Sequence, residues 1–290
     1  MIHTARLTES VTVDGDTEKR GLKIEGSDIH FGYEKSKILN GIELEVREGE
    51  FLVLMGPSGC GKSTLLRLLA GLEQPNRGEI RVDGISAQDQ QPDCGVVFQD
   101  YSLFPWLTTR ENVVLALKQK WKGKKSKKEL QHFAEEFLSL VKLDHAIKKY
   151  PGEMSGGMKQ RAAIARALAF GSDLLLMDEP FGALDPVTRI QLQDLLLQIS
   201  REQKRTIVFV THDADEAIYL ADRIILFSTG NTGAGISSIE VPLDKRKTRK
   251  ALYESRAFIE FREYLLTVMN RELLDQMEEA DDVRSPGYGI

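Results

Sequence analysis

The sequence has few of the residues that mark a secreted, disulfide-bonded or membrane-spanning protein. Its 290 residues include only two cysteines, Cys60 and Cys94, and neither has a partner at a disulfide-framework or metal-binding spacing. No apolar run approaches the roughly 20 residues that cross a bilayer, and the first ten residues, MIHTARLTES, have no apolar core. We therefore expect a protein of a reducing cytosol whose contact with any membrane is peripheral.

The chain also lacks an excess of positive charge. Its 39 Lys and Arg residues face 44 Asp and Glu residues, which leaves a net charge of −5. That balance argues against a protein whose main task is to hold a phosphodiester backbone, so nucleic acid is not an expected partner. Hydrophobic residues make up 41% of the chain, enough at this length to bury a full core.

The apolar segments predict an α/β fold. Five buried-type strands alternate with helical segments, which is typical of a parallel sheet: FLVLM (51–55), GVVF (95–98), LLLM (174–177), TIVFV (206–210) and RIILF (223–227). Before them, short β-rich stretches broken by glycines between residues 22 and 51 predict an antiparallel layer. Residues 99–171 show helical periodicity, with Phe133, Phe137, Leu140 and Val141 on one face, and predict an inserted helical subdomain.

Residues 56–63 read GPSGCGKS and match the phosphate-loop pattern G-x-x-x-x-G-K-[ST] between a strand and the helical run STLLRLLAGL. In such a loop, successive backbone N–H groups bind phosphate, and we expect a side chain at Gly59 or Gly61 to block that approach. Lys62 then reaches the β- and γ-phosphates, and the Ser63 hydroxyl faces Mg²⁺. The predicted nucleotide-binding residues here are Gly56, Pro57, Ser58, Gly59, Cys60, Gly61, Lys62, Ser63 and Thr64.

Two acids end a second apolar strand. Asp178 and Glu179 follow LLLM and precede Pro180. A carboxylate at the end of a buried strand is costly without a cation or a reacting water beside it. We expect Asp178 to hold Mg²⁺, directly or through water, and Glu179 to polarise the attacking water. Acids that end a strand only for solubility are the alternative, and the phosphate loop makes it the weaker one.

A third motif, Met154-Ser155-Gly156-Gly157-Met158 followed by KQRAAIARAL, lies between these two. Together with the phosphate loop, the Asp-Glu-Pro segment, Gln99, the 183–185 turn and His212, it makes residues 20–230 resemble an ATP-binding-cassette ATPase with a P-loop NTPase core. The resemblance implies that Tyr33 stacks on adenine, that Gln99 senses the γ-phosphate and Mg²⁺, and that His212 bridges the γ-phosphate and the catalytic region. The implied catalytic residues are Glu179, His212, Gln99 and Lys62; the metal ligands are Ser63, Gln99 and Asp178; Asp185 joins the nucleotide-binding set.

The Ser-Gly-Gly sequence also has a physical reading. A helix that begins at Ser155, Gly156 and Gly157 offers free N–H groups and a positive dipole end to an anion. The chain already has one complete phosphate loop, and ATP has one γ-phosphate. We therefore expect this helix start to bind ATP held by a second subunit, in a head-to-tail sandwich dimer. An ordinary helix cap without a ligand is the alternative.

Smaller features resemble one branch of the family. Met158, the Leu103–Thr108 segment LFPWLT, the FGALD turn (181–185) and the stretch FIEFREYLL (258–266) are similar to subunits of nitrate, taurine and aliphatic sulfonate importers. The resemblance implies import of a small solute, an anion of this kind, at the cytoplasmic face of the inner or plasma membrane. The implied partners are an identical or paired ATPase subunit, two permease subunits and, indirectly, an extracytoplasmic solute-binding protein.

Two other functions fit the sequence less well. A soluble cassette acting on nucleic acid or ribosomes generally carries two cassettes or a long coiled coil, and this chain has one cassette and no sustained heptads. A non-hydrolysing regulator would lack Glu179 or His212, and both are present. ATP hydrolysis coupled to transport is therefore the predicted activity.

The expected parts of the chain are a flexible arm (1–20), a nucleotide-binding core with its antiparallel layer (21–98 and 172–230), the helical subdomain (99–171) and a C-terminal extension with an acidic tail (231–290). Two basic clusters, at 118–128 and 245–250, are expected to be solvated surface. For both clusters, contact with anionic lipid headgroups is the alternative.

Overall fold

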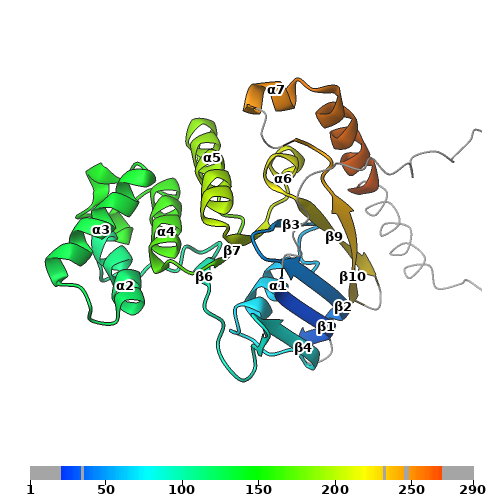
Figure 1. The fold of residues 1–290 in the computed structure, drawn as a ribbon, viewed down its shortest axis with the longest axis horizontal. Coiled ribbons are helices and arrows are strands. Elements are labelled where there is room, and N and C mark those ends of the chain that lie inside the picture. The colour runs from blue at the N-terminus through cyan, green and yellow to red at the C-terminus, as the bar shows by residue number, and fades with distance from the viewer. Residues whose placement is uncertain (1–20, 34–35, 231–232, 245–247, 270–290) are drawn as a thin grey trace, which may run out of the picture.

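The computed structural model describes residues 21–33, 36–230, 233–244 and 248–269. One ten-stranded sheet runs through it, in the order β5-β4-β1-β2-β10-β9-β3-β8-β7-β6. Figure 1 shows a group of helices at one end of this sheet and the antiparallel strands at the other. The predicted arm at 1–20 and the acidic tail within 270–290 lie outside the described residues.

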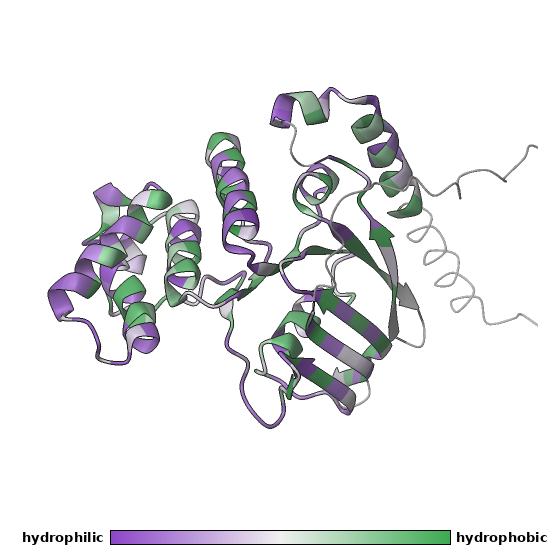
Figure 2. Ribbon diagram, in the orientation of Figure 1, coloured by the Kyte–Doolittle hydropathy of each residue, from purple (hydrophilic) through white to green (hydrophobic). Residues whose placement is uncertain are grey.

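The antiparallel end of the sheet is built from four strands, β1 (Leu22–Tyr33), β2 (Ser36–Arg47), β4 (Arg77–Val82) and β5 (Ile85–Ser86). Buried and exposed residues alternate along β1 and β2, and Figure 2 shows this as green and purple bands across the strands. The expectation of short strands broken by glycine is wrong here. Instead the β1–β2 register shifts near Gly26 and Gly32, so these glycines sit beside irregularities within two long strands.

The parallel part contains the five predicted strands: β3 (Phe51–Met55), β6 (Gly95–Val97), β7 (Leu174–Asp178), β8 (Thr206–Val210) and β9 (Arg223–Gly230). Every residue of β3, β7 and β8 is buried, as expected when helices cover both faces of a parallel sheet. Strand β10 (Gly233–Glu240) runs antiparallel to β9 and pairs in parallel with β2 at Ala234 and Leu39. It therefore joins the two parts into one sheet.

Two hydrophobic clusters lie on opposite faces of the parallel strands. Leu52 and Leu54 of β3 face α1 (Lys62–Leu69) and the antiparallel layer. Phe51, Val53 and Met55 of the same strand face the other cluster, which includes α5 (Pro186–Gln203) and α6 (Ala214–Leu220). This alternation along β3 follows from the two-residue period of a strand. The phosphate loop directly follows β3, so it lies between the two layers.

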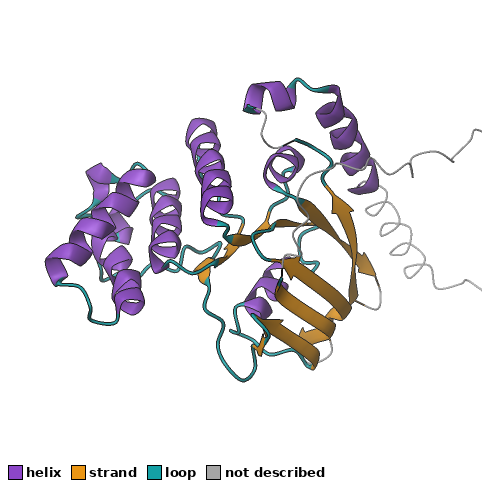
Figure 3. Cartoon of the chain, viewed as in Figure 1, coloured by secondary structure: helices purple, strands orange, loops and turns teal. Residues whose placement is uncertain are grey.

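Three helices from the middle of the chain form a separate group: α2 (Thr109–Trp121), α3 (Lys127–Leu140) and α4 (Gly156–Phe170), with 3₁₀ turns at Asp144–Ala146 and Pro151–Glu153. Figure 3 shows this group without strands between its helices. Thr108 and Ser126 begin α2 and α3 with capping boxes that use Glu111 and Glu129. The predicted fold class, a parallel core with an antiparallel layer and an inserted helical subdomain, is confirmed.

The buried face of α3 differs in part from the predicted one. Leu130, Ala134 and Leu138 are its buried residues, Phe133 and Phe137 are half-buried, and Leu140 is 50% exposed. Leu140, the last residue of α3, therefore does not share this buried face, whereas Val141, which caps the helix, is fully buried. After β10, α7 (Arg249–Tyr253) and a helical stretch at 256–269 pack beside α6. Within the described ranges, no helix is long and apolar enough to cross a bilayer.

Candidate functional site

The candidate residues follow the carboxyl ends of neighbouring parallel strands. β3 leads into the 56–61 loop, β6 into Gln99, β7 ends at Asp178, and β8 leads into His212. Strand β3 pairs with β8, β8 with β7, and β7 with β6, all in parallel. The ends of parallel strands meet at one edge of a sheet, which is where open α/β proteins bind their ligands. Segments far apart in the sequence are thereby brought together.

The 56–61 loop has the backbone conformation expected of a phosphate loop. Gly56, Gly59 and Gly61 have φ values of 145°, 82° and 101°, which L side chains rarely adopt. A Cβ at Gly61 would lie 2.7 Å from the Leu39 side chain, whereas one at Gly59 would meet nothing within 4 Å. The predicted reason for Gly61, access of a phosphate, is therefore accompanied by a packing reason inside the fold. Gly61 also begins α1 without a side-chain cap, which leaves the first helical N–H groups to a ligand.

Lys62 is held inside this loop. Its side chain is buried, and its ammonium group donates to the carbonyl oxygens of Gly56 at 2.8 Å and Pro57 at 2.6 Å. It also lies 3.4 Å from the Cys60 sulfur. Burial raises the pKa of the Cys60 thiol, so this cysteine stays protonated and fills space behind the loop. The loop thus carries a fixed positive charge next to its free N–H groups.

Ser63, Gln99 and Asp178 line one cavity of ≈ 560 Å³. Asp178 is 8% exposed, and burial raises the pKa of its carboxyl group, while a hydrogen bond from the Ser63 hydroxyl opposes this. A buried carboxylate whose charged form is disfavoured gains from a nearby cation. Hydroxyl, amide and carboxylate oxygens are the donors that Mg²⁺ accepts in proteins. The three predicted metal ligands therefore fit Mg²⁺ in both donor type and shared location.

Glu179 and His212 lie beside each other at the ends of β7 and β8. The His212 Nδ1 atom is 3.4 Å from a carboxylate oxygen of Glu179. Glu179 has a φ of 44°, an uncommon conformation for a non-glycine residue, and its N–H donates to the Val210 carbonyl at 3.1 Å. The turn after β7 is therefore tied to the neighbouring strand. Strained backbone of this kind clusters at functional sites, where the surroundings hold it in place.

Tyr33 ends β1, and its ring is 52% exposed. Its hydroxyl donates to the carboxylate of Glu73 at 2.9 Å, and Glu73 lines the cavity that contains Ser63. The ring also contacts Phe31 edge-on, with centroids 5.1 Å apart. These contacts hold an exposed aromatic face near the rim of the cavity, in a position suited to stacking on a flat base.

Ser155 lies on a different part of the molecule. It caps α4, where its hydroxyl accepts from the Met158 N–H at 3.3 Å, and it is exposed. α4 packs against α2, α3 and β6, whereas α1 packs against β4, β7 and β8. The residues that line the Ser63 cavity do not include Ser155, Gly156, Gly157 or Asp185.

Gly157 and Asp185 also make contacts inside the fold. A Cβ at Gly157 would lie 2.9 Å from the Ala183 carbonyl oxygen, so the start of α4 packs closely on the 183–185 turn. Asp185 caps α5 by accepting from the Thr188 N–H at 3.0 Å, and hydrogen bonds with the Thr188 side chain and with this N–H lower the pKa of its carboxyl group. Both residues therefore have local roles in the fold, and the nucleotide-binding roles that the resemblance implies for them stay predictions.

Asn112 is a residue that the sequence reasoning missed. It is fully buried in α2 and accepts from the Phe104 N–H at 2.9 Å, while its amide group lies within 3.2 Å of the Phe104 and Leu107 carbonyls. These bonds fix the loop that follows Gln99 and leave Trp106 69% exposed. An asparagine inside the apolar run ENVVLAL was the available signal, since a buried amide needs partners.

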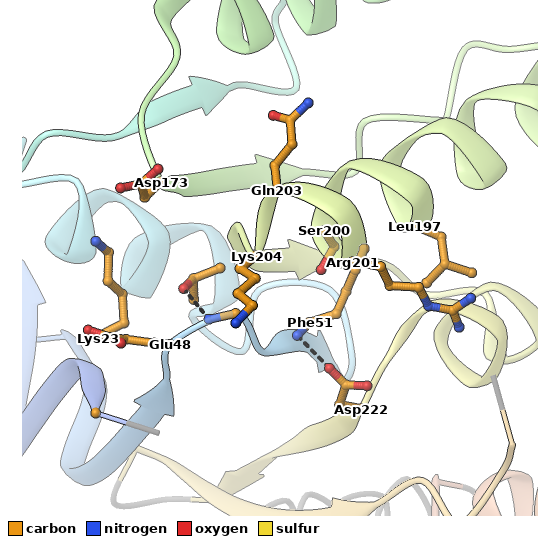
Figure 4. Close-up of a pocket in the computed structure, with 13 residues that line it drawn as sticks. Lys23, Glu48, Phe51, Asp173, Leu197, Ser200, Arg201, Gln203, Lys204 and Asp222 are labelled. Carbon is orange, nitrogen blue, oxygen red and sulfur yellow. Dashed lines mark hydrogen bonds between the residues drawn. The ribbon is translucent and has the colours of Figure 1, made fainter. Parts of the chain in front are cut away.

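A second pocket, of ≈ 900 Å³, lies at the opposite end of the parallel strands, around the first residues of β3, β8 and β9. Figure 4 shows its charged side chains, among them Lys23, Glu48 and Lys204. Thr206 and Asp222 accept from the N–H groups of Gly49 and Phe51, each at 2.9 Å, and so tie strand starts together. This edge carries amino ends of strands, so we assign no active-site role to it.

The 118–128 lysine cluster surrounds the turn between α2 and α3. Trp121 stacks on Phe133, with ring centroids 6.3 Å apart, and the Lys125 ammonium lies 5.4 Å from the Trp121 centroid. The other lysines of the cluster are exposed: Lys118, Lys120, Lys122, Lys124, Lys127 and Lys128. This agrees with the expected solvated surface, and the alternative of lipid contact stays a prediction.

Comparison with known proteins gives a consistent set of relatives. The family model described as ABC transporter matches residues 39–182. The chain is 46% identical over 235 residues to the bicarbonate transport ATP-binding protein CmpC of Synechocystis sp., covering 81% of this chain and 35% of that one. It is 43% identical over 230 residues to the nitrate import ATP-binding protein NrtD of Synechococcus elongatus, covering 79% and 84%.

Two further comparisons cover nearly all of the relative. An ABC transporter ATP-binding protein of Methanocaldococcus jannaschii is 41% identical over 265 residues, which are 91% of this chain and 96% of that one. A solved dimeric ATP-binding cassette, in a post-hydrolysis state bound to ADP and Pi, superposes with a TM-score of 0.70 at 33% identity, covering 76% of this chain and 100% of the other. The chain thus spans whole cassettes but only about a third of the bicarbonate relative.

Proposed function

This chain belongs to the ABC transporter family of ATP-binding-cassette ATPases, and we propose that it hydrolyses ATP to energise import of a small anion through separate membrane-spanning subunits. The observation that carries the proposal is the shared cavity of Ser63, Gln99 and Asp178, next to the buried Lys62 and the Glu179–His212 pair. These groups come from four parallel strands and meet at one edge of the sheet. They comprise the charges and donors that phosphoryl transfer requires.

The proposed roles follow from the geometry. The N–H groups of the 56–61 loop and the start of α1 bind the phosphates, together with the Lys62 ammonium. Ser63, Asp178 and Gln99 hold Mg²⁺, which supplies positive charge to neutralise the phosphate oxygens when it is bound. Glu179 orients and polarises the attacking water, and His212 lies 3.4 Å away to contact the γ-phosphate region. Tyr33 provides a stacking surface for adenine.

We propose that the second helix start, at Ser155, acts on nucleotide held by another copy of this chain or by a paired subunit. The packing of the two helices supports this, because α4 packs against α2, α3 and β6, whereas α1 packs against β4, β7 and β8. The dimeric state of the solved cassette supports it too. Closure of such a dimer around ATP gives a conformational change whose equilibrium depends on the γ-phosphate, and this dependence is what a motor requires.

The loop after Gln99 is the proposed docking surface for a permease subunit. Gln99, Asp100 and Ser102 line the nucleotide cavity, and Asn112 fixes the same loop a few residues later, with Trp106 exposed at its tip. A partner that binds Trp106 is therefore linked through one short segment to the γ-phosphate sensor. This arrangement would place the chain peripherally on the cytoplasmic face of the membrane, with a solute-binding protein acting indirectly through the permease.

The proposed cargo is a small inorganic or sulfonate-type anion. Nitrate, expected from the sequence, is named for one relative, and bicarbonate is named for another. Both are small planar anions. Taurine and aliphatic sulfonates stay predictions from the sequence resemblance.

The ATPase part is tested by Glu179→Gln in the purified full chain. The amide keeps the shape of the side chain but cannot accept a proton or attract the water by charge, so kcat should fall by about 100-fold or more while ATP binding persists. Glu202→Gln, on an exposed face of α5, is the control and should keep parental kcat. Parental turnover in Glu179→Gln would show that the water-activating role is assigned to the wrong residue.

Transport is tested in membrane vesicles that contain the chain and the permease encoded with it. ATP-dependent uptake of labelled nitrate, bicarbonate and taurine is measured in parallel, with Glu179→Gln vesicles as the blank. We expect uptake of one small anion with the parental chain and none with the variant. Uptake that continues with Glu179→Gln would contradict the proposal that this chain energises transport.

A further inference from the structure

The segment that follows β10, residues 248–269, packs on helices α5 and α6. Phe258, Phe261 and Leu265 are buried in the same hydrophobic cluster as α5 and α6, and Tyr253 stacks on Phe258 with centroids 4.5 Å apart. Figure 1 shows α7 and the following helix beside α6. The 245–250 cluster was expected to be solvated surface, and for Arg249 this expectation is wrong.

Arg249 joins this segment to both α5 and α6. Its guanidinium lies 3.6 Å from the centroid of the Tyr219 ring in α6. Its Nη2 atom donates to the Asp194 carboxylate at 2.8 Å, and its Nη1 atom donates to the side-chain oxygen of Gln193 at 2.9 Å. The Arg249 side chain is only 22% exposed. Its charge is therefore used inside the fold.

The contact with Gln193 continues into the protein. Gln193 is 5% exposed, and its amide NH₂ donates to the Glu216 carboxylate at 2.8 Å. An amide side chain presents its oxygen on one side and its NH₂ on the other. Because the Arg249 guanidinium can only donate, it holds the Gln193 oxygen toward itself and the NH₂ toward Glu216. Without Arg249, the Gln193 oxygen loses this donor, and the side chain loses one of the two hydrogen bonds that fix its orientation toward Glu216.

Glu216 connects this chain of hydrogen bonds to the His212 turn. It is 5% exposed and also hydrogen-bonds the Thr211 side chain. The Thr211 hydroxyl oxygen in turn accepts from the Asp213 N–H at 3.1 Å, and the Asp213 side chain accepts from the Glu216 N–H at 3.1 Å. The residues on both sides of His212 are thus held by Glu216. The His212 side chain itself is 72% exposed, so its position depends on this backbone.

We propose that Arg249 is a positioning residue for His212, acting through Gln193, Glu216 and Thr211 to hold the imidazole beside Glu179. The C-terminal segment thereby takes part in ATP hydrolysis although none of the proposed nucleotide-binding residues belongs to it. The inference rests on the proposed role of His212. Any partner or truncation that displaces the 248–269 segment would lower turnover without touching the nucleotide site.

The test compares two arginines that attach the same segment to the core. Arg249→Met keeps the apolar length of the side chain but removes the donors to Gln193. Arg262→Met is the matched control, because Arg262 pairs with Asp215 of α6 and is not part of the hydrogen-bond chain to Thr211. Full-length variants are assayed at saturating protein and Mg-ATP concentrations, and melting temperature is measured in parallel. We expect Arg249→Met to lower kcat about tenfold, with KM for ATP within twofold, and Arg262→Met to keep kcat within twofold.

A double variant tests the route. If Arg249 acts through Gln193, then adding Arg249→Met to Gln193→Met should lower kcat no further than Gln193→Met alone, whereas independent effects would multiply. Multiplied losses, or an equal loss of kcat in Arg262→Met, would overturn the proposal. If Arg249→Met does not fold, Arg249→Lys replaces it, because a lysine keeps the charge but cannot reach Gln193 and Asp194 together. Its kcat should fall about threefold, and parental kcat would overturn the proposal.

His212→Ala separates this inference from the function on which it rests. Loss of turnover in His212→Ala with parental kcat in Arg249→Met overturns the positioning role and leaves the proposed function intact. Parental turnover in His212→Ala removes the proposed role of His212 and the inference with it. Loss in both, with the Arg262→Met control unaffected, supports both.

Discussion

Replacement of Ser155 by aspartate distinguishes a helix cap from a phosphate-binding residue. Aspartate caps a helix as well as serine does, and its negative charge suits the N-terminal end of α4. If Ser155 only caps α4 through its bond to Met158, the variant should fold and turn over ATP normally. If the same position contacts the γ-phosphate, like charges about 4 Å apart repel by about 4 kcal/mol at an effective dielectric constant of 20. Turnover should then fall by about a thousandfold.

Mixing two inactive variants shows on which subunit Ser155 acts. A Lys62→Ala subunit and a Ser155→Asp subunit each lack one half of every site in their own homodimer. In a mixed dimer, the intact Lys62 of one subunit faces the intact Ser155 of the other and restores one of the two composite sites. Random pairing makes about half of all dimers mixed, so the mixture should regain about a quarter of parental activity if the sites act independently, and less if they are coupled.

Phosphate release is measured at saturating Mg-ATP, either with the membrane partners or at high protein concentration so that dimers form. The control is Ser126→Asp, because Ser126 caps α3 with the same hydroxyl-to-backbone bond and has no proposed ligand. It should keep parental turnover. Parental turnover in Ser155→Asp would refute the phosphate-binding role. A mixture that stays inactive, although cross-linking shows ATP-bound mixed dimers, would refute independent composite sites.

Three further outcomes are expected. Lys62→Ala should weaken binding of a fluorescent nucleotide and abolish hydrolysis, since the phosphates lose their fixed counter-charge; unchanged affinity and turnover would contradict the phosphate-loop assignment. Tyr33→Ala should weaken ATP binding by about two- to tenfold with a smaller effect on kcat, because stacking is worth roughly 0.5–1.5 kcal/mol. Tyr33→Phe keeps the ring and should bind ATP as tightly as the parental protein. Asp178→Asn should abolish Mg²⁺-dependent turnover. It should also raise the melting temperature of the nucleotide-free protein at neutral pH, because burial raises the pKa of the Asp178 carboxyl group and the ionised carboxylate therefore destabilises the fold. That gain should shrink as pH falls through the carboxyl range, where Asp178 takes up its proton in the parental protein; a lower melting temperature at pH 7 would contradict this sign.

The five parallel strands were predictable because each is a short, mainly apolar run, and such runs suit the interior of a covered sheet. The antiparallel layer was harder. Glycines within 22–51 indicated breaks, but the pairing of β1 with β2 continues past Gly26 and Gly32 through shifts of register. Pairing is a contact between two strands, so the composition of one strand does not decide where the paired region ends.

The helical face of α3 shows the same limit at smaller scale. Periodicity correctly indicated a helix, yet Leu140, its last residue, is exposed while Val141, its C-cap, is fully buried. Arg249 is the clearer case. In the sequence it is one of several basic residues after the core, and only its contacts with Gln193 and Tyr219 separate it from its solvated neighbours.

The sequence by itself determined the chemistry of this protein. A phosphate loop is one continuous segment whose glycines set the backbone conformation locally, so its residues and the class of their ligand can be read without a fold. The tertiary structure decided which distant residues share a site: Ser63, Gln99 and Asp178 are separated by 36 and 79 positions and meet only because β3, β8, β7 and β6 are neighbours. It also decided which polar side chains are buried together, as in the chain from Arg249 to Thr211. Burial and hydrogen-bond partners depend on the packing of whole elements, and this packing is set by long-range contacts rather than by local sequence.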